Sequence, residues 1–158
     1  MTQLKLKVDQ IQALPDFFKE INDPRQPCGK RHSLPTVLAL ITAAVLCGMK
    51  GYKGISDWVQ ALSPKARARF RCRYRNGRYP VPSESTIRSV LIQVDPVELD
   101  RAFQAWSAQY GIEDNALAID GKTMCNAIDH AGKQTHIMSA IGHTSLQCYT
   151  QKKSAHYL

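Results

Sequence analysis

The spacing of apolar residues changes near residue 112, and this change limits the possible fold more than any other feature of the sequence. Before it, apolar residues recur at helical intervals between breaks rich in proline and glycine. After it come three short apolar runs that are typical of strands. These runs lie at residues 116–120, 135–142 and 146–152. We therefore expect an α+β chain, with a helical domain over residues 1–111 and a three-stranded antiparallel meander within residues 112–158.

Short polar residues, often followed by proline, mark the expected helix starts. Asp95-Pro96 gives the clearest start, and Glu98 stands where a capping box would reach back to the helix end. Pro15 is expected to open a short helix that runs through residue 21. The other expected N-caps are Ser33, Ser63, and either Ser83 or Ser85.

Positive charge is concentrated in the helical part of the chain. Residues 1–111 carry 17 Lys and Arg against 9 Asp and Glu, whereas residues 112–158 carry 4 against 4. The whole formal charge of +8 therefore belongs to the first part. A basic part joined to a neutral part indicates that one of them meets a polyanion.

A basic tract lies between Asp57 and Glu84, a stretch that contains no acid. Arginines two apart point the same way on a strand, so we expect Arg71, Arg73 and Arg75 to form one cationic edge with Cys72 and Tyr74 behind it. Such a row suits a phosphate backbone, because each neutralised phosphate releases counterions. A solvated charged surface is the alternative. The cations of this basic tract are Lys65, Arg67, Arg69, Arg71, Arg73, Arg75 and Arg78.

The helix expected after residue 83 has a polar side near its N-terminal end. Four residues there face away from the apolar stripe, namely Ser85, Thr86, Arg88 and Ser89. A recognition helix of helix-turn-helix type presents its N-terminal residues to base edges in this way. An ordinary amphipathic helix would show the same periodicity, and the pattern alone does not separate the two.

Asp120 ends the first apolar run and is followed by Gly121. A carboxylate at the tip of a strand suits metal-dependent phosphoryl transfer, because Mg²⁺ takes hard oxygen ligands and completes its shell with water and phosphate. A plain Asp-Gly turn is the competing interpretation. The His and Cys residues after residue 124 match no standard zinc spacing.

The sequence indicates a cytoplasmic protein that does not enter a membrane. Its N-terminus lacks the order of a signal peptide, and its five cysteines form no Cys-x-x-Cys pair, which favours reduced thiols. The longest apolar run, residues 34–49, contains two threonines and falls short of the roughly 20 residues that a bilayer needs. We expect it to be a buried helix.

Several segments together resemble the ISAs1-family transposases, also known as H-repeat-associated proteins. They occur in the family's order and span roughly residues 10–153. The matching segments are Asp23-Pro24-Arg25, residues 29–35, residues 44–48, residues 51–58, residues 82–88, Val94-Asp95-Pro96, residues 118–123 and Gln151-Lys152-Lys153.

This resemblance implies a helical N-terminal region followed by a DDE catalytic domain of ribonuclease-H-like fold. Such a domain opens with a three-stranded meander whose first strand carries the first catalytic acid, a position that Asp120 matches. In the intact family this acid helps to hold Mg²⁺ or Mn²⁺. The basic tract and the helix after residue 83 would contact double-stranded DNA at transposon ends, in bacterial cytoplasm and associated with the nucleoid.

The match to the family breaks off after residue 153. Where relatives continue through most of the catalytic domain, this chain reads Ser154-Ala155-His156-Tyr157-Leu158, and its only acid after Asp120 is Asp129. One Asp does not hold two metal ions. We therefore expect a truncated transposase that does not cleave DNA alone and does not stably bind the metals. The alternatives are a DNA-binding regulator at transposon ends, which self-associates or joins full-length transposase, and a non-functional relic.

Overall fold

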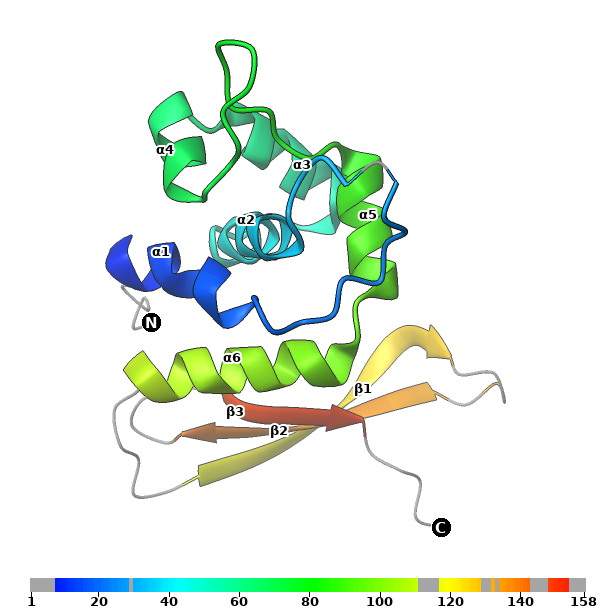
Figure 1. Cartoon of the computed structure of the whole chain (residues 1–158). Helices are drawn as coiled ribbons and strands as arrows, with labels where there is room; N and C mark the ends of the chain where they lie inside the picture. The colour runs from blue at the N-terminus through cyan, green and yellow to red at the C-terminus, as the bar shows by residue number, and fades with distance from the viewer. Residues whose placement is uncertain are drawn as a thin grey trace. The chain divides into compact units, whose positions relative to one another are not determined.

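The computed structural model describes residues 8–28, 30–110, 117–128, 132, 134–142 and 148–153, and these form an α+β protein (Figure 1). The chain divides into two compact units, Met1–Ala102 and Phe103–Leu158. The boundary expected between residues 111 and 112 lies outside the described residues. The elements are α1 (Val8–Phe17), α2 (Leu34–Leu46), α3 (Gly51–Ala61), α4 (Pro64–Arg69), α5 (Glu84–Gln93), α6 (Pro96–Tyr110), β1 (Leu117–Ile128), β2 (Gln134–Gly142) and β3 (Cys148–Lys153).

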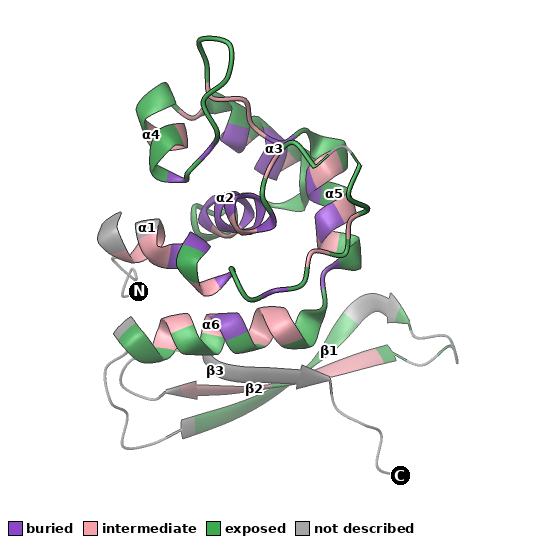
Figure 2. Cartoon of the chain, in the orientation of Figure 1, coloured by how far each residue is buried: buried purple, intermediate pink, exposed green. Residues whose placement is uncertain are grey.

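Helix α2 is the centre of the first unit. Its sequence is apolar nearly all round, which is typical of a helix buried on every side. Ser33 is its N-cap, because the Ser33 hydroxyl accepts a hydrogen bond from the backbone N–H of Thr36 at 3.4 Å. Most of α2 is buried, as Figure 2 shows. The expectation of a buried helix over this apolar run is confirmed.

Helices α1, α3 and α5 pack around α2 and complete the core. Each contributes apolar side chains at helical spacing. Burying one such side chain stabilises the fold by about 1.5–3 kcal/mol. The fully or nearly fully buried contributors are Leu14 and Phe18 near α1, Ile55 and Val59 in α3, and Ile87 and Val90 in α5.

Helix α2 ends in a Schellman motif, which turns the chain into α3. Gly48 has φ 85°, and its backbone N–H donates to Val45 O at 2.9 Å. The next N–H, of Met49, donates to Ala44 O at 3.0 Å. This left-handed position favours glycine, because a Cβ there is crowded by the following carbonyl.

No single described helix is both long and apolar enough to cross a bilayer, although α2 and α3 together pass that test by length and composition, as a pair bent by 103°.

Two expected helix starts differ from the structure. Pro15 lies inside the last turn of α1, so the expectation that it opens a helix is wrong; the helix begins at Val8 and has already formed about two turns before Pro15. Glu98 does not complete a capping box. Its carboxylate instead accepts from the backbone N–H of Asn22 at 2.8 Å and from Asn22 Nδ2, which ties the start of α6 to the segment after α1.

Other expected caps are confirmed. Ser63 and Ser83 cap α4 and α5 with their hydroxyls. Asp95 Oδ1 accepts from the backbone N–H of Val97 at 2.8 Å at the start of α6.

The described strands form one antiparallel sheet in the order β1-β2-β3, as the expected meander requires. Strand β1 is longer than expected and continues through Gly121 to Ile128. Asp120 therefore lies inside the strand, opposite Ser139 of β2, and not at its tip. The Asp-Gly pair does not turn here, because ladder pairing with β2 runs on through Thr123.

Candidate nucleic-acid interface

The basic tract begins in α4, a short helix capped by Ser63 and opened by Pro64. Helix α4 ends in a second Schellman motif. In this motif the N–H of Arg71 donates to Ala68 O at 2.9 Å, and the N–H of Cys72 donates to Arg67 O at 3.0 Å. Arg71 has φ 61°, so an arginine occupies the left-handed position that glycine normally takes. Buried Phe70 and Cys72 anchor this turn to the core.

Arg67 is held by the protein's own backbone. Its Nε donates to Leu62 O at 2.9 Å, and its two terminal nitrogens donate to Tyr79 O at 3.1 Å and to Gln60 O at 2.5 Å. The planar guanidinium thereby joins the end of α3 to the chain that returns from the tract. Arg67 positions the tract and has few donors left for a ligand.

Arg71 is also engaged internally. Its Nη1 donates to Asp16 Oδ1 at 2.8 Å, and its Nη2 contacts the other oxygen of the same carboxylate. These hydrogen bonds, together with one from Lys19, lower the pKa of Asp16 far below its usual value. Arg71 O accepts a hydrogen bond from the buried hydroxyl of Thr36 in α2 at 3.4 Å. Both ends of this residue therefore attach the tract to the helical core.

The expected strand over residues 71–75 is wrong. Arg71 turns the chain through its left-handed conformation, and Tyr74 is 61 % exposed. Arg75 and Arg78 instead face each other across a two-residue turn, with backbone hydrogen bonds of 2.8 Å and 3.2 Å between them. Asn76 (φ 50°) and Gly77 (φ 76°) form this turn; two successive left-handed residues, here Asn-Gly, are the signature of a type I′ hairpin.

Five cations of the basic tract have exposed side chains that make no hydrogen bond or ion pair to another described residue. They are Lys65, Arg69, Arg73, Arg75 and Arg78. Seven cations were expected to face a ligand together. The structure divides them into two that build the fold and five that remain on its surface.

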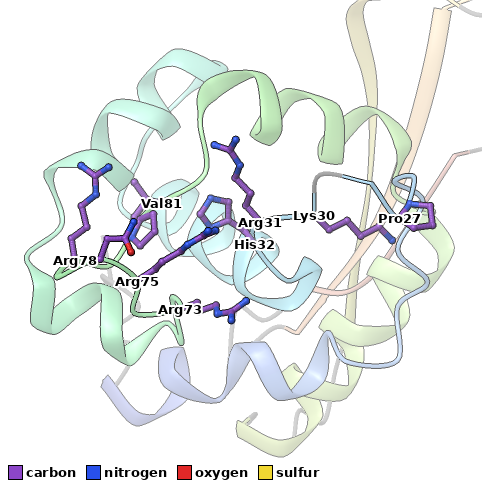
Figure 3. A pocket seen from close by; sticks show the side chains of 10 residues that line it. Pro27, Lys30, Arg31, His32, Arg73, Arg75, Arg78 and Val81 are labelled. Carbon is purple, nitrogen blue, oxygen red and sulfur yellow. The ribbon is translucent and has the colours of Figure 1, made fainter.

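A hollow of about 620 Å³ lies between this hairpin and an earlier loop (Figure 3). Its lining contains no acid, although positive side chains reach it from both walls. Figure 3 shows the Arg75 side chain extending across the hollow toward His32. One wall is formed by Pro27, Lys30, Arg31 and His32; the other by Arg73, Arg75, Asn76, Arg78, Pro80 and Val81.

Lys30, Arg31 and His32 were not predicted from the sequence to belong to a site. The segment Gly29-Lys30-Arg31-His32 is basic, but it is about 40 positions from the tract. The fold brings the two segments together, because the loop leads directly into α2 and Thr36 of α2 donates a hydrogen bond to Arg71 O. The sequence held one signal for this wall of the hollow: three consecutive residues with basic side chains come directly before the Ser33 cap.

The loop wall is fixed by an internal clamp. Arg25 donates to both carboxylate oxygens of Asp23, at 2.9 Å and 2.8 Å, and to His32 O at 2.9 Å. The same carboxylate pairs with Lys30 at 3.2 Å, and the pKa of Asp23 falls to about 2, chiefly through its hydrogen bond from Arg25. The pKa of His32 is lowered by burial and then by the positive charges of Arg25 and Arg31. His32 therefore lies in a positive electrostatic environment.

Helix α5 presents the expected polar residues at its N-terminal end. Ser85 and Arg88 are exposed, and Thr86 and Ser89 are half-buried. The Arg88 guanidinium lies 6.0 Å from the centre of the Tyr52 ring of α3, a cation–π distance. A smaller hollow of about 250 Å³ separates α5 from the loop, lined by Arg25, Gln26, Cys28, Lys30, Ser85, Thr86 and Ser89.

Asp120 is exposed on β1. It belongs to the second unit, whereas the basic tract and both hollows belong to the first. Among the residues that the structure describes, no group of three or more His, Cys, Asp or Glu side chains is arranged to hold a metal ion.

The chain is similar to three proteins of known sequence. It is 31% identical over 136 residues to the "Uncharacterized protein in dhlA 3'region" of Xanthobacter autotrophicus, covering 78% of this chain and 42% of that one. It is 27% identical over 160 residues to "H repeat-associated putative transposase YbfD" of Escherichia coli, covering 96% and 58%. It is 26% identical over 142 residues to "H repeat-associated putative transposase YhhI" of the same organism, covering 87% and 34%.

The chain thus spans between about a third and three fifths of the length of these relatives. No solved structure matches it. The family described as DDE_Tnp_1-associated matches residues 15–107, which include α2 to α5, both walls of the hollow and the whole basic tract. This chain belongs to that transposase-associated family.

Proposed function

We propose that the helical unit binds double-stranded DNA at transposon ends as the DNA-contacting part of a transposase-related protein, in the bacterial cytoplasm at the nucleoid. One observation carries the proposal. Lys65, Arg69, Arg73, Arg75 and Arg78 remain exposed without an acidic partner among the described residues. Cations held at one surface repel each other, and a phosphate backbone removes that cost while its counterions are released.

Helix α5 supplies the sequence-reading part of this proposal. Phosphate contacts fix the position of a protein on a duplex, whereas base contacts specify the sequence. Ser85, Thr86, Arg88 and Ser89 carry hydroxyl and guanidinium groups that suit base edges. Arg88 is steadied by the Tyr52 ring, which lowers the entropy lost when it binds.

Salt dependence tests the DNA-binding proposal. The full chain is titrated against a fluorescein-labelled duplex carrying a transposon end and against a scrambled duplex, from 50 to 300 mM NaCl. With five phosphate contacts, log Kd should change with log salt by a slope of about 4.5. Binding that is flat across this range contradicts a phosphate-driven interface. Equal affinity for both duplexes contradicts only the sequence-reading role of α5 and leaves the phosphate-driven interface standing.

We further propose that β1–β3 correspond to the opening strands of a ribonuclease-H-like domain, with Asp120 at the first catalytic position, and that this 158-residue chain does not cut DNA by itself. The order and antiparallel pairing of the strands support the first part. The second rests on the residues of this chain, among which Asp129 is the only acid after Asp120.

Incubation with supercoiled plasmid and Mg²⁺ or Mn²⁺ tests the absence of cleavage. The plasmid should remain supercoiled with the wild-type chain and with Asp120→Ala alike. Nicking by the wild type that is lost in Asp120→Ala would show that the chain is active on its own.

A regulatory role, through association with a longer relative or a second copy, is favoured by one feature of the sheet. Within the described residues β1 pairs only with β2, and its Ile119 and Ile128 are 72 % and 64 % exposed. An unpaired edge with apolar side chains is open to another strand. Light scattering of the purified chain should detect a dimer, and a monomer at high concentration would rule out self-association.

A further inference from the structure

Two basic segments that are distant in the sequence converge on the hollow of Figure 3. Arg31 comes from the loop before α2, whereas Arg73, Arg75 and Arg78 come from the hairpin. The volume of about 620 Å³ falls within the range of about 300–1,000 Å³ that is typical of ligand sites. The hollow is therefore large enough to enclose part of a ligand and is not merely a charged face.

The charge of the hollow is uncompensated. Lys30 is paired with Asp23, but Arg31, Arg73, Arg75 and Arg78 make no ion pair among the described residues, and no acid lines the walls. Gathering four guanidinium groups in this way costs free energy in the isolated protein. An anionic ligand with several oxygens recovers that cost.

Both walls are held in place before any ligand arrives. Arg25 fixes the loop wall through Asp23 and His32 O. Arg67 fixes the hairpin wall where it rejoins the fold, through Tyr79 O. A preformed site loses less conformational entropy on binding than two mobile segments would.

We propose that this hollow is a seat for the phosphodiester backbone of one DNA strand, in which Arg31 from the loop and Arg75 from the hairpin contact the same stretch of phosphates. The inference rests on the proposed function and identifies where on the helical unit the DNA backbone binds. Guanidinium groups suit phosphate because each presents paired N–H donors to two oxygens. Arg31 thereby becomes a DNA-binding residue outside the basic tract.

Single substitutions in the full chain test the seat. The probe is a fluorescein-labelled 20-base-pair duplex, titrated at several NaCl concentrations. Arg31→Ala and Arg75→Ala should each weaken binding by about tenfold and lower the salt slope by about 1. Lys50→Ala is the matched control, because Lys50 is an exposed cation of the same unit that lines neither hollow. Its effect should be much smaller.

The double variant Arg31→Ala/Arg75→Ala tests whether the two side chains share a ligand. Their effects should not multiply, because residues that contact one group are coupled. Arg31→Lys should restore part of the affinity, since lysine keeps the charge but loses the paired donors. Melting curves for each variant confirm that the fold is retained.

The outcomes separate the two proposals. If the wild type binds but Arg31→Ala behaves like Lys50→Ala, the seat is wrong and DNA binding stands. If the wild type does not bind duplex DNA at 50 mM NaCl, both proposals fail. If Arg31→Ala weakens the binding of tripolyphosphate but leaves the affinity for the duplex unchanged, the hollow takes free phosphates and the assignment to a DNA strand is overturned.

Discussion

The Arg71 guanidinium at the end of α4 binds the carboxylate of Asp16 in α1, 55 positions earlier, and it does so from a left-handed backbone conformation. The equivalent position at the end of α2 is Gly48, which adopts the same kind of conformation without strain. Arginine costs about 1 kcal/mol more than glycine there. The contact to Asp16 explains why the less favourable residue stands at this position.

Arg71→Ala and Arg71→Gly should therefore differ in stability. Both lose an ion pair whose partners are 47 % and 43 % exposed, worth about 0.5–1 kcal/mol. Glycine also removes the left-handed strain, so Arg71→Gly should be near neutral while Arg71→Ala is destabilised. Urea unfolding at 25 °C measures the difference, and a glycine variant less stable than the alanine variant would contradict it.

Gly48→Ala is the matched control for the backbone contribution. A Cβ at this position meets nothing within 4 Å, so any effect comes from the left-handed conformation alone. We expect a loss of about 1 kcal/mol in the free energy of unfolding.

Gly77→Ala should weaken DNA binding without removing a charge. Gly77 has φ 76° in the hairpin turn, and a Cβ there again meets open space. Alanine disfavours this turn by about 1 kcal/mol, which displaces Arg75 and Arg78 from the hollow. Affinity for the 20-base-pair duplex should fall severalfold while the free energy of unfolding falls by no more than about 1 kcal/mol. Asn76→Gly keeps a left-handed turn and should bind like the wild type; equal affinity of all three would show that the turn does not position the arginines.

Asp23→Asn should make the protein less stable at neutral pH but not in acid. The folded-state pKa of Asp23 is about 2, below the usual value of an aspartate, so its ionised form stabilises the folded state. This contribution is present above pH 4 and is lost as the pH falls through 2. We expect the variant to lose about 1–2 kcal/mol at pH 7. Thermal melts from pH 2 to 7 should show the two curves converging in acid; a constant gap would contradict the assignment.

DNA affinity should rise as the pH falls from 8 toward 5. Burial and the charges of Arg25 and Arg31 lower the pKa of His32 in the free protein, so it is neutral at pH 7. Phosphate in the hollow would raise that pKa, and binding would then take up a proton. Asp23 stays ionised throughout this range and adds no dependence. Anisotropy at constant ionic strength should show the trend in the wild type and its loss in His32→Gln.

The elements that could be predicted from sequence are those set by neighbouring residues. Ser33, Ser63 and Asp95 cap their helices because a short polar side chain reaches an N–H two or three residues away. The meander was also predictable, since its strands pair in chain order. These interactions need no distant partner.

The features that were missed depend on residues far apart in the chain. Glu98 has the spacing of a capping box, yet Asn22 outcompetes the local backbone for its carboxylate. Alternating arginines suggested a strand, but Arg71 turns toward Asp16 and the Asn-Gly pair folds the tract back. Likewise, nothing local to Arg31 indicates that it lines the same hollow as Arg75. The Asn76-Gly77 pair is the local sequence signal for this hairpin.

Cys72 is buried within the basic tract, and its chemical reactivity can report local opening of the tract. Its thiol is only 5 % exposed and burial raises its pKa, whereas Cys28 and Cys47 are exposed. Alkylating reagents attack the thiolate, so they should modify Cys28 and Cys47 before Cys72. Labelling of Cys72 then proceeds only through transient opening of the turn beside Arg71. The rate of Cys72 labelling measures how often the segment that carries the arginines opens locally. A bound ligand that holds this segment closed would lower the labelling rate.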